Sequence, residues 1–210
     1  MVNFDLAIQH FKKVDLLLAD ITTKMLKNNN LPGTTSKTKP TAYVFHLYSS
    51  IISQQISTKA ADKILERFLG LVGDPHDAAN ILKYDIDDLR SIGLSRQKAS
   101  YIRSIAELTS NGTVKVDHLD ALSDDEVVRE LILIKGVGQW TAEMFLMFTL
   151  ARPDIFSGGD LGLLNAAKKL YSKPDMTKQE LLELSNKWSP HRTAAALVLW
   201  HSLDNKPTSV

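Results

Sequence analysis

Apolar residues recur along most of this chain at intervals of three and four, the spacing that lines one face of an α-helix. No window shows the sustained alternation of apolar and polar residues that a half-buried strand requires. The ten glycines and seven prolines are scarce for 210 residues, and they cluster between the periodic stretches. The pattern therefore predicts an all-α protein with about ten helices.

The periodic stretches also predict where the helices begin and end. Ser95 precedes one stretch as a cap residue, and Ser123 with Glu126 forms a capping-box pattern before another. We expect the polar stretch 28–40 to be a loop. The first helix is expected to bury Phe4, Ala7, Ile8, Phe11, Val14, Leu17 and Leu18. Further helices are expected at 43–53, 58–71, 77–83, 85–92, 96–110, 126–134, 139–151, 161–171, 177–188 and 191–201.

These helices suggest two helical subdomains within a single unit of residues 1–210. Residues 42–150 are expected to form a central bundle, and residues 1–27 are expected to pack with 155–210 as the second. We expect a cleft between the two, which is where binding sites commonly form.

Composition excludes several classes of protein. The 25 Lys and Arg residues nearly balance the 24 Asp and Glu residues, which rules out a histone-like basic protein and an acidic disordered one. A local basic patch still permits nucleic-acid binding. Without cysteine, the chain has no disulfide, cysteine-ligated zinc, iron–sulfur cluster or cysteine nucleophile. The apolar runs are too short for a bilayer and no signal peptide is visible. We expect an intracellular protein, nuclear in a eukaryote and cytoplasmic in a bacterium, with no membrane partner.

The most informative segment is residues 133–144, Leu-Ile-Lys-Gly-Val-Gly-Gln-Trp-Thr-Ala-Glu-Met. Gly136 and Gly138 flank one apolar residue, Val137, between two predicted helices in a hairpin at 134–140. Glycine permits backbone angles that other residues avoid, and the first amides of the second helix attract an anion such as phosphate. Val137 would anchor the turn in the core. The alternative is an ordinary tight helix–helix connection.

Together with the segment 159–163, Gly-Asp-Leu-Gly-Leu, this hairpin resembles the helix-hairpin-helix DNA glycosylase superfamily. It is most similar to the alkylbase (3-methyladenine) DNA glycosylase II type of bacteria and yeasts. Segments 50–57 with 59–61, 89–102 and 188–200 agree with that family in order and spacing, so the resemblance spans residues 42–201. It implies an all-α fold with a helix-hairpin-helix motif.

The resemblance also implies a catalytic residue, Asp160, which lies 22 residues after Gly138. Cleavage of the bond between base and deoxyribose passes through an oxocarbenium-like state, which a nearby carboxylate stabilises. The alternative is that Asp160 only caps the predicted helix 161–171. The two roles are compatible.

At residue 140, members of the superfamily that also cut the DNA strand carry a nucleophilic lysine. This chain has Trp140, which cannot form a Schiff base, so the resemblance implies a monofunctional hydrolase without lyase activity. Trp140 and Trp200 are implied to line the base pocket, where an aromatic ring attracts a cationic alkylated base. The alternative for each tryptophan is a place in the core.

The resemblance assigns DNA contacts as well. Gln55 would wedge into the stack when the nucleotide flips out, although it could instead be an ordinary surface amide. The phosphate-binding set comprises Lys135, Gly136, Val137 and Gly138, with Lys59 and Arg96 as further contacts. The carbonyls of Ile132, Ile134 and Val137 are implied to coordinate a monovalent cation, and no other cofactor is expected.

The implied function is base-excision repair of double-stranded DNA that contains alkylated bases or abasic sites, by a monomer with DNA-3-methyladenine glycosylase activity. Three departures from the family pattern favour an alternative, a weak or inactive relative that only binds damaged DNA. Leu164 stands where many relatives have arginine, Ser157 where many have proline, and His191 where an aromatic residue often precedes the arginine.

Overall fold

The computed structural model describes residues 2–32 and 37–204, and it confirms the all-α prediction, with no strand in these residues. Parts of the predicted loop 28–40 and of the predicted terminal subdomain lie outside the described residues. None of the helices in the described ranges is long and apolar enough to cross a membrane.

The α-helices are α1 (Phe4–Val14), α2 (Leu16–Lys27), α3 (Tyr43–Ser53), α4 (Thr58–Val72), α5 (Ala78–Leu82), α6 (Ile86–Ser91), α7 (Arg96–Ser110), α8 (Asp124–Leu131), α9 (Gln139–Phe148), α10 (Leu161–Leu170), α11 (Lys178–Ser185) and α12 (Arg192–Asp204). Short 3-10 helices lie at Pro40–Ala42, Val116–Ala121 and Asn186–Trp188.

The helices form two compact units. One contains Met1–Lys37 and Leu146–Val210, and the other contains Thr38–Phe145, so the boundary falls inside α9. The expected division placed this boundary after residue 150 rather than within the helix. The cleft expected between the subdomains stays a prediction.

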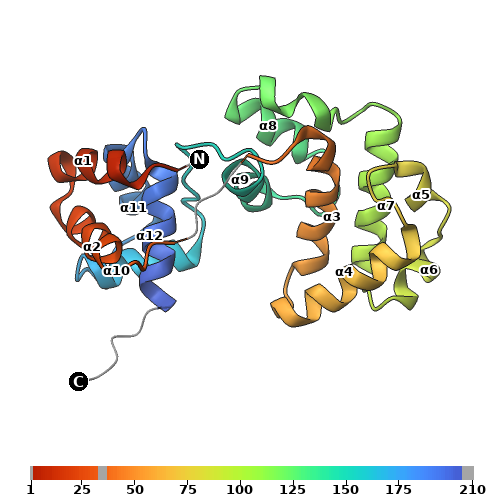
Figure 1. Ribbon diagram of the computed structural model, residues 1–210, viewed down its shortest axis with the longest axis horizontal. Helices are drawn as coiled ribbons and strands as arrows, with labels where there is room; N and C mark the ends of the chain where they lie inside the picture. Colours follow the sequence, from red (N-terminus) through yellow and green to blue (C-terminus); the bar gives the residue numbers. More distant parts are fainter. Residues whose placement is uncertain (1, 33–36, 205–210) are drawn as a thin grey trace. The chain divides into compact units, whose positions relative to one another are not determined.

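The unit of residues 38–145 is built around α3 and α7, which lie side by side (Figure 1). Helix α7 also packs against α5 and α6, and α3 packs against α4. Both α3 and α7 have the boundaries that were predicted. Ser95 is the N-cap of α7, as expected, because its side chain accepts the amide hydrogen of Lys98. The buried side chains of α3 are Tyr43, Val44, Leu47, Tyr48, Ile51 and Ile52.

The other unit has α12 at its centre, in contact with α10, α1 and α2 (Figure 1). Residues 194–199 of α12 are all buried. A helix that is apolar around its whole circumference is one enclosed by other helices, and α12 fits that rule.

The prediction of one continuous first helix was wrong, because the chain breaks at Asp15 into α1 and α2. Asp15 has an extended backbone, with φ of −159°, and its carboxylate caps α2 by accepting the Leu18 amide at 3.0 Å. The other carboxylate oxygen accepts hydrogen bonds from the Tyr171 hydroxyl at 2.5 Å and the Trp188 indole at 2.9 Å. The break turns Leu17, expected in the core, out to 52% exposure.

Val14, also expected in the core, is 37% exposed for the same reason. Other boundaries moved by a few residues. The capping box at Ser123 and Glu126 is confirmed, but α8 begins at Asp124 and ends at Leu131. Helix α9 stops at Phe148 rather than 151, because Ala151 has a φ of +52° and the Arg152 amide turns back to the Leu146 carbonyl at 3.0 Å.

Replacing Asp15 with alanine should destabilise the protein by about 2–4 kcal/mol, because it removes an N-cap and leaves the buried Trp188 indole without its acceptor. The Tyr171 hydroxyl also loses this acceptor, but that residue is only half-buried. The matched control is Asp20→Ala in the same helix, where an exposed ion pair with Lys24 at 2.6 Å is lost. Thermal and urea unfolding should show a large change for the first variant and almost none for the second. Equal changes would contradict the role given to Asp15.

Candidate functional site

The glycine segment forms a tight turn between α8 and α9. The Val137 amide donates to the Ile134 carbonyl at 3.0 Å, and Gly136 has a φ of +91°, in the left-handed region that favours glycine. Ile134 and Val137 are buried, whereas Lys135 and Gly138 are exposed. The turn is thus anchored from inside by two apolar side chains and presents its polar groups outward, as predicted for Val137.

The two glycines of the hairpin differ in what surrounds them. A Cβ atom on Gly136 would lie 2.1 Å from Cδ2 of Tyr101, far inside van der Waals contact. A Cβ atom on Gly138 would have no neighbour within 4 Å. Gly136 is therefore required by its packing against α7 as well as by its φ, while Gly138 leaves the backbone open to an approaching group.

Helix α9 starts directly after this turn. The Ala142 amide donates to the Gly138 carbonyl at 3.0 Å, as the first hydrogen bond of the helix. The amides before it point out of the helix N-terminus, where the helix dipole favours an anion. Trp140 is 48% exposed in the first turn of α9, which excludes the alternative that it is a core residue.

Gln55 lies in the turn between α3 and α4, with an exposed side chain and a φ of +58°. Its neighbour Gln54 connects this turn to the hairpin, because the Gln54 side-chain amide donates to the Gly136 carbonyl at 3.2 Å. Lys98 of α7 donates to the carbonyls of Ile52 at 2.8 Å and Gln54 at 2.6 Å. The structure thus brings the predicted wedge and the predicted phosphate site onto one connected framework.

Sequence reasoning gave no role to Gln54, Lys98 or Tyr101. All three lie inside segments that carry the family resemblance, 50–57 and 89–102. Their residue types alone indicate no chemistry, and only the folded backbone shows that they meet at the hairpin and the turn.

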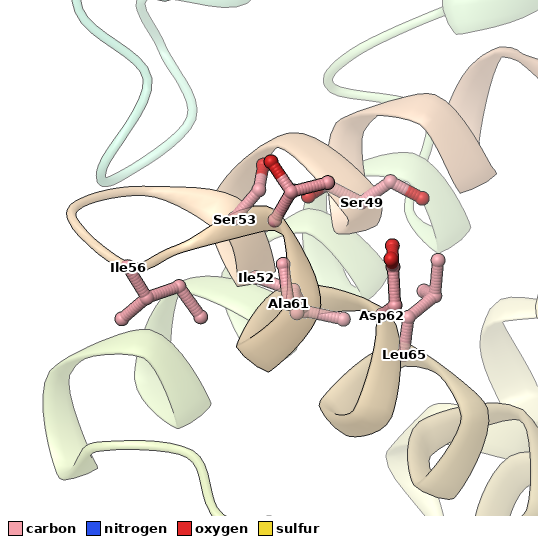
Figure 2. A pocket seen from close by; sticks show the side chains of 8 residues that line it. Ser49, Ile52, Ser53, Ile56, Ala61, Asp62 and Leu65 are labelled. Carbon is pink, nitrogen blue, oxygen red and sulfur yellow. The ribbon is translucent and has the colours of Figure 1, made fainter.

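A hollow of about 250 Å³ lies beside the Gln55 turn, between the end of α3 and the start of α4 (Figure 2). Figure 2 shows Ile56 at one side and Asp62 and Leu65 at the other, with Ser49 and Ser53 along α3. Because this side is hollow, side-chain packing supports the turn poorly there. Its position consequently depends more on hydrogen bonds.

Asp160 caps α10 in the other unit, so the capping role weighed for it is confirmed. One carboxylate oxygen, Oδ1, accepts the Leu163 amide at 2.8 Å and also the Trp200 indole N–H at 3.1 Å. A Cβ atom on Gly162 would lie 3.0 Å from that oxygen and 3.3 Å from the Trp200 ring. The three residues therefore fit closely, and the half-buried carboxylate is held in one orientation.

The two predictions for Trp200 were a place in the base pocket and a place in the core. The structure puts its ring only partly in the core, where its indole N–H donates to Asp160. Its ring is half-buried and stacks on Phe148, with centroids 6.3 Å apart and planes at 26°. Phe148 and Leu161 are themselves exposed, at 44% and 63%. An aromatic and apolar surface thus adjoins the carboxylate, a combination suited to a flat base attached to a sugar.

Two of the departures from the family pattern have structural explanations. Leu164 is buried in its unit, where a charged side chain would be costly. His191 packs against His10, with ring centroids 5.6 Å apart, and burial lowers the pKa of His191. Arg192 pairs with Asp154 at 2.9 Å, which makes this arginine a structural residue.

Comparison with known proteins agrees with this geometry. Residues 48–191 match the family described as the HhH-GPD superfamily base excision DNA repair protein, which is more than half of the chain. The chain therefore belongs to the helix-hairpin-helix superfamily of base-excision DNA repair proteins.

Individual relatives lie within that superfamily. YfjP of Bacillus subtilis is 33% identical over 162 residues, covering 73% of this chain and 56% of YfjP, so the chain spans little more than half of that relative. The DNA-3-methyladenine glycosidase of Bacillus halodurans is 34% identical, with a TM-score of 0.79 over 92% of this chain and 87% of that one. The Schizosaccharomyces pombe 3-methyladenine DNA glycosylase Mag1, in complex with abasic DNA, is 32% identical, with a TM-score of 0.74 over 92% and 94%.

The two hairpin glycines give a paired test of the turn. Gly136→Ala should destabilise the protein by about 2–4 kcal/mol, because it combines an unfavourable positive φ with displacement of Tyr101. Gly138→Ala should leave the melting temperature nearly unchanged and weaken DNA binding, since its methyl group stands where a phosphate would approach. Thermal unfolding and DNA titration of both variants measure this. A Gly136→Ala protein as stable as Gly138→Ala would refute the packing argument.

Proposed function

We propose that this protein is a monofunctional DNA-3-methyladenine glycosylase of base-excision repair, which hydrolyses the N-glycosidic bond of alkylated purines in double-stranded DNA. The observation that carries the proposal is the Asp160 carboxylate, oriented by Leu163 and Trp200 beside an exposed aromatic surface. The names of the Bacillus halodurans and Schizosaccharomyces pombe relatives support the substrate class.

Asp160 would act on the sugar. An alkylated purine is already cationic, so the bond to C1′ breaks with both electrons going to the base and without a general acid. The carboxylate stabilises the positive charge that develops on the sugar and orients water for attack at C1′. Addition of water gives the C1′ hydroxyl of the abasic site and releases one proton.

The aromatic residues would recognise the base. Trp140 is half exposed after the hairpin, and the exposed ring of a tryptophan attracts a cationic purine more strongly than a neutral one. With an indole rather than a primary amine at this position, the protein forms no Schiff base with the abasic site. Hydrolysis without strand cleavage follows.

DNA binding would use the unit of residues 38–145. Lys135 and the backbone of Gly136, Val137 and Gly138 would hold a phosphate at the start of α9. Gln55 would enter the stack in place of the flipped nucleotide. The Mag1 complex with abasic DNA supports DNA as the partner. A monomer acting inside the cell, in the compartment that contains the DNA, completes the proposal.

The carbonyls of Ile132, Ile134 and Val137 would be the ligands of a monovalent cation at the hairpin. The Ile134 carbonyl already accepts the Val137 amide, and its second lone pair leaves it able to coordinate. Such a cation would stiffen the turn and add positive charge where the phosphate binds.

The direct test is to incubate the protein with methylated duplex DNA and to quantify free 3-methyladenine and 7-methylguanine by chromatography. Treatment with borohydride should trap no covalent complex, and strands should break only after alkali. Specific binding of abasic DNA without base release would instead identify a relative that only binds damage.

Asp160→Asn should reduce single-turnover base release by about 10²–10³-fold, the usual loss when a preorganised electrostatic group is removed. Asparagine caps helices about as well as aspartate, so the melting temperature and the DNA affinity should stay close to those of the wild type. Base release by this variant at nearly the wild-type rate would show that Asp160 is a cap only.

A further inference from the structure

The Gln55 turn and the hairpin are joined by a short chain of polar contacts. Lys98 donates to the carbonyl of Ile52 near the end of α3 and to the carbonyl of Gln54 directly after that helix. The Gln54 side chain in turn donates to the Gly136 carbonyl. Tyr101, one turn further along α7 than Lys98, packs against Gly136. Helix α7 therefore fixes both the turn and the hairpin.

The turn depends on this support for two reasons. Gln55 has a positive φ, which is unfavourable for a residue with a side chain and persists only when the surroundings impose it. The hollow beside Ile56 reduces the side-chain packing on one side of the turn. The carbonyls at the C-terminus of α3 lack helical partners, and a lysine is a favourable one because it opposes the helix dipole.

We propose that Lys98 and Gln54 are positioning residues that lock the Gln55 turn to the phosphate-binding hairpin. When the hairpin binds a DNA phosphate, this lock keeps Gln55 at a fixed distance from that phosphate along the DNA. This inference rests on the proposed function for the roles of Gln55 and the hairpin. The lock itself is a property of the free protein.

Lys98 could be mistaken for another phosphate contact. However, its ammonium group has three hydrogens, and two of them are committed to carbonyls at 2.8 and 2.6 Å. The side chain is half-buried, and burial lowers the pKa of Lys98. These features distinguish it from Lys135, which is exposed on the hairpin.

The first experiment needs no DNA. Amide hydrogen exchange is measured in the wild type, in Lys98→Met and in Gln54→Ala, with Lys63→Met as a control that removes an exposed lysine of α4. Both test variants should accelerate exchange about tenfold in the last turn of α3 and at Val137, the magnitude expected for one lost hydrogen bond. The Lys98 ammonium group reaches the hairpin through Gln54, so unchanged exchange at Val137 in Lys98→Met would overturn the lock.

The second experiment measures affinity for abasic and undamaged duplexes over a range of salt concentrations. Lys98→Met and Gln54→Ala should lose about tenfold in affinity for the abasic duplex, as for one hydrogen bond, and stay near the wild type on undamaged DNA. Their log–log salt slope should be unchanged, whereas Lys135→Met should reduce the magnitude of the slope by about 0.9, as for one phosphate. A slope reduced by Lys98→Met, with equal losses on both duplexes, would make Lys98 a phosphate ligand and overturn the proposal.

The two experiments separate the inference from the function on which it rests. A wild type that releases no base and does not prefer the abasic duplex refutes the proposed function, and the exchange measurement still decides whether the lock exists. If the wild type prefers the abasic duplex and both test variants keep that preference in full, the positioning role is refuted and the proposed function is not.

Discussion

A single carboxylate oxygen, Oδ1 of Asp160, accepts the amide hydrogen of Leu163 in the first turn of α10 and the indole N–H of Trp200 from α12. Helices α10 and α12 are thereby connected at the residue proposed to act on the sugar. The same contacts that make Asp160 a good helix cap also fix the direction of its charge. The same arrangement of Asp160 therefore serves both stability and the proposed catalysis. Gly162 permits this arrangement, because a larger residue there would crowd the Asp160 carboxylate and the Trp200 ring.

In the unit of residues 38–145, side chains of one helix likewise fix the parts that are proposed to act on DNA. Its DNA-facing parts are proposed to be two turns, and each contains a residue with a positive φ, Gln55 in one and Gly136 in the other. Helix α7 holds both, through the ammonium group of Lys98 and the ring of Tyr101. A nucleotide can be flipped out only if the wedge does not yield, and rigid turns on a packed helix meet that requirement.

Much of this could be predicted from the sequence because it is local. The helical period, the caps at Ser95 and Ser123 and the glycine hairpin each involve residues a few positions apart, and the structure has them as predicted. The missed features join distant parts of the chain. The break at Asp15 is stabilised by Tyr171 and Trp188, more than 150 residues away, which no local pattern reveals. The roles of Lys98 and Trp200 likewise depend on which backbone atom or carboxylate lies opposite them after folding.

The central claim is that the oriented carboxylate of Asp160 carries the catalysis. The measurement that tests it most directly is a double-mutant cycle on single-turnover base release, with Trp200→Phe made in the wild type and in Asp160→Asn. Phenylalanine keeps a six-membered ring against Phe148 and removes the N–H donor to Asp160 together with the pyrrole part of the indole. The account predicts that Trp200→Phe slows base release when it is made in the wild-type protein, by a similar factor for 3-methyladenine and 7-methylguanine. The same substitution should cause almost no further loss when it is made in Asp160→Asn. The same loss in both backgrounds would show that Trp200 acts on the base and that its hydrogen bond to Asp160 is not part of the catalysis.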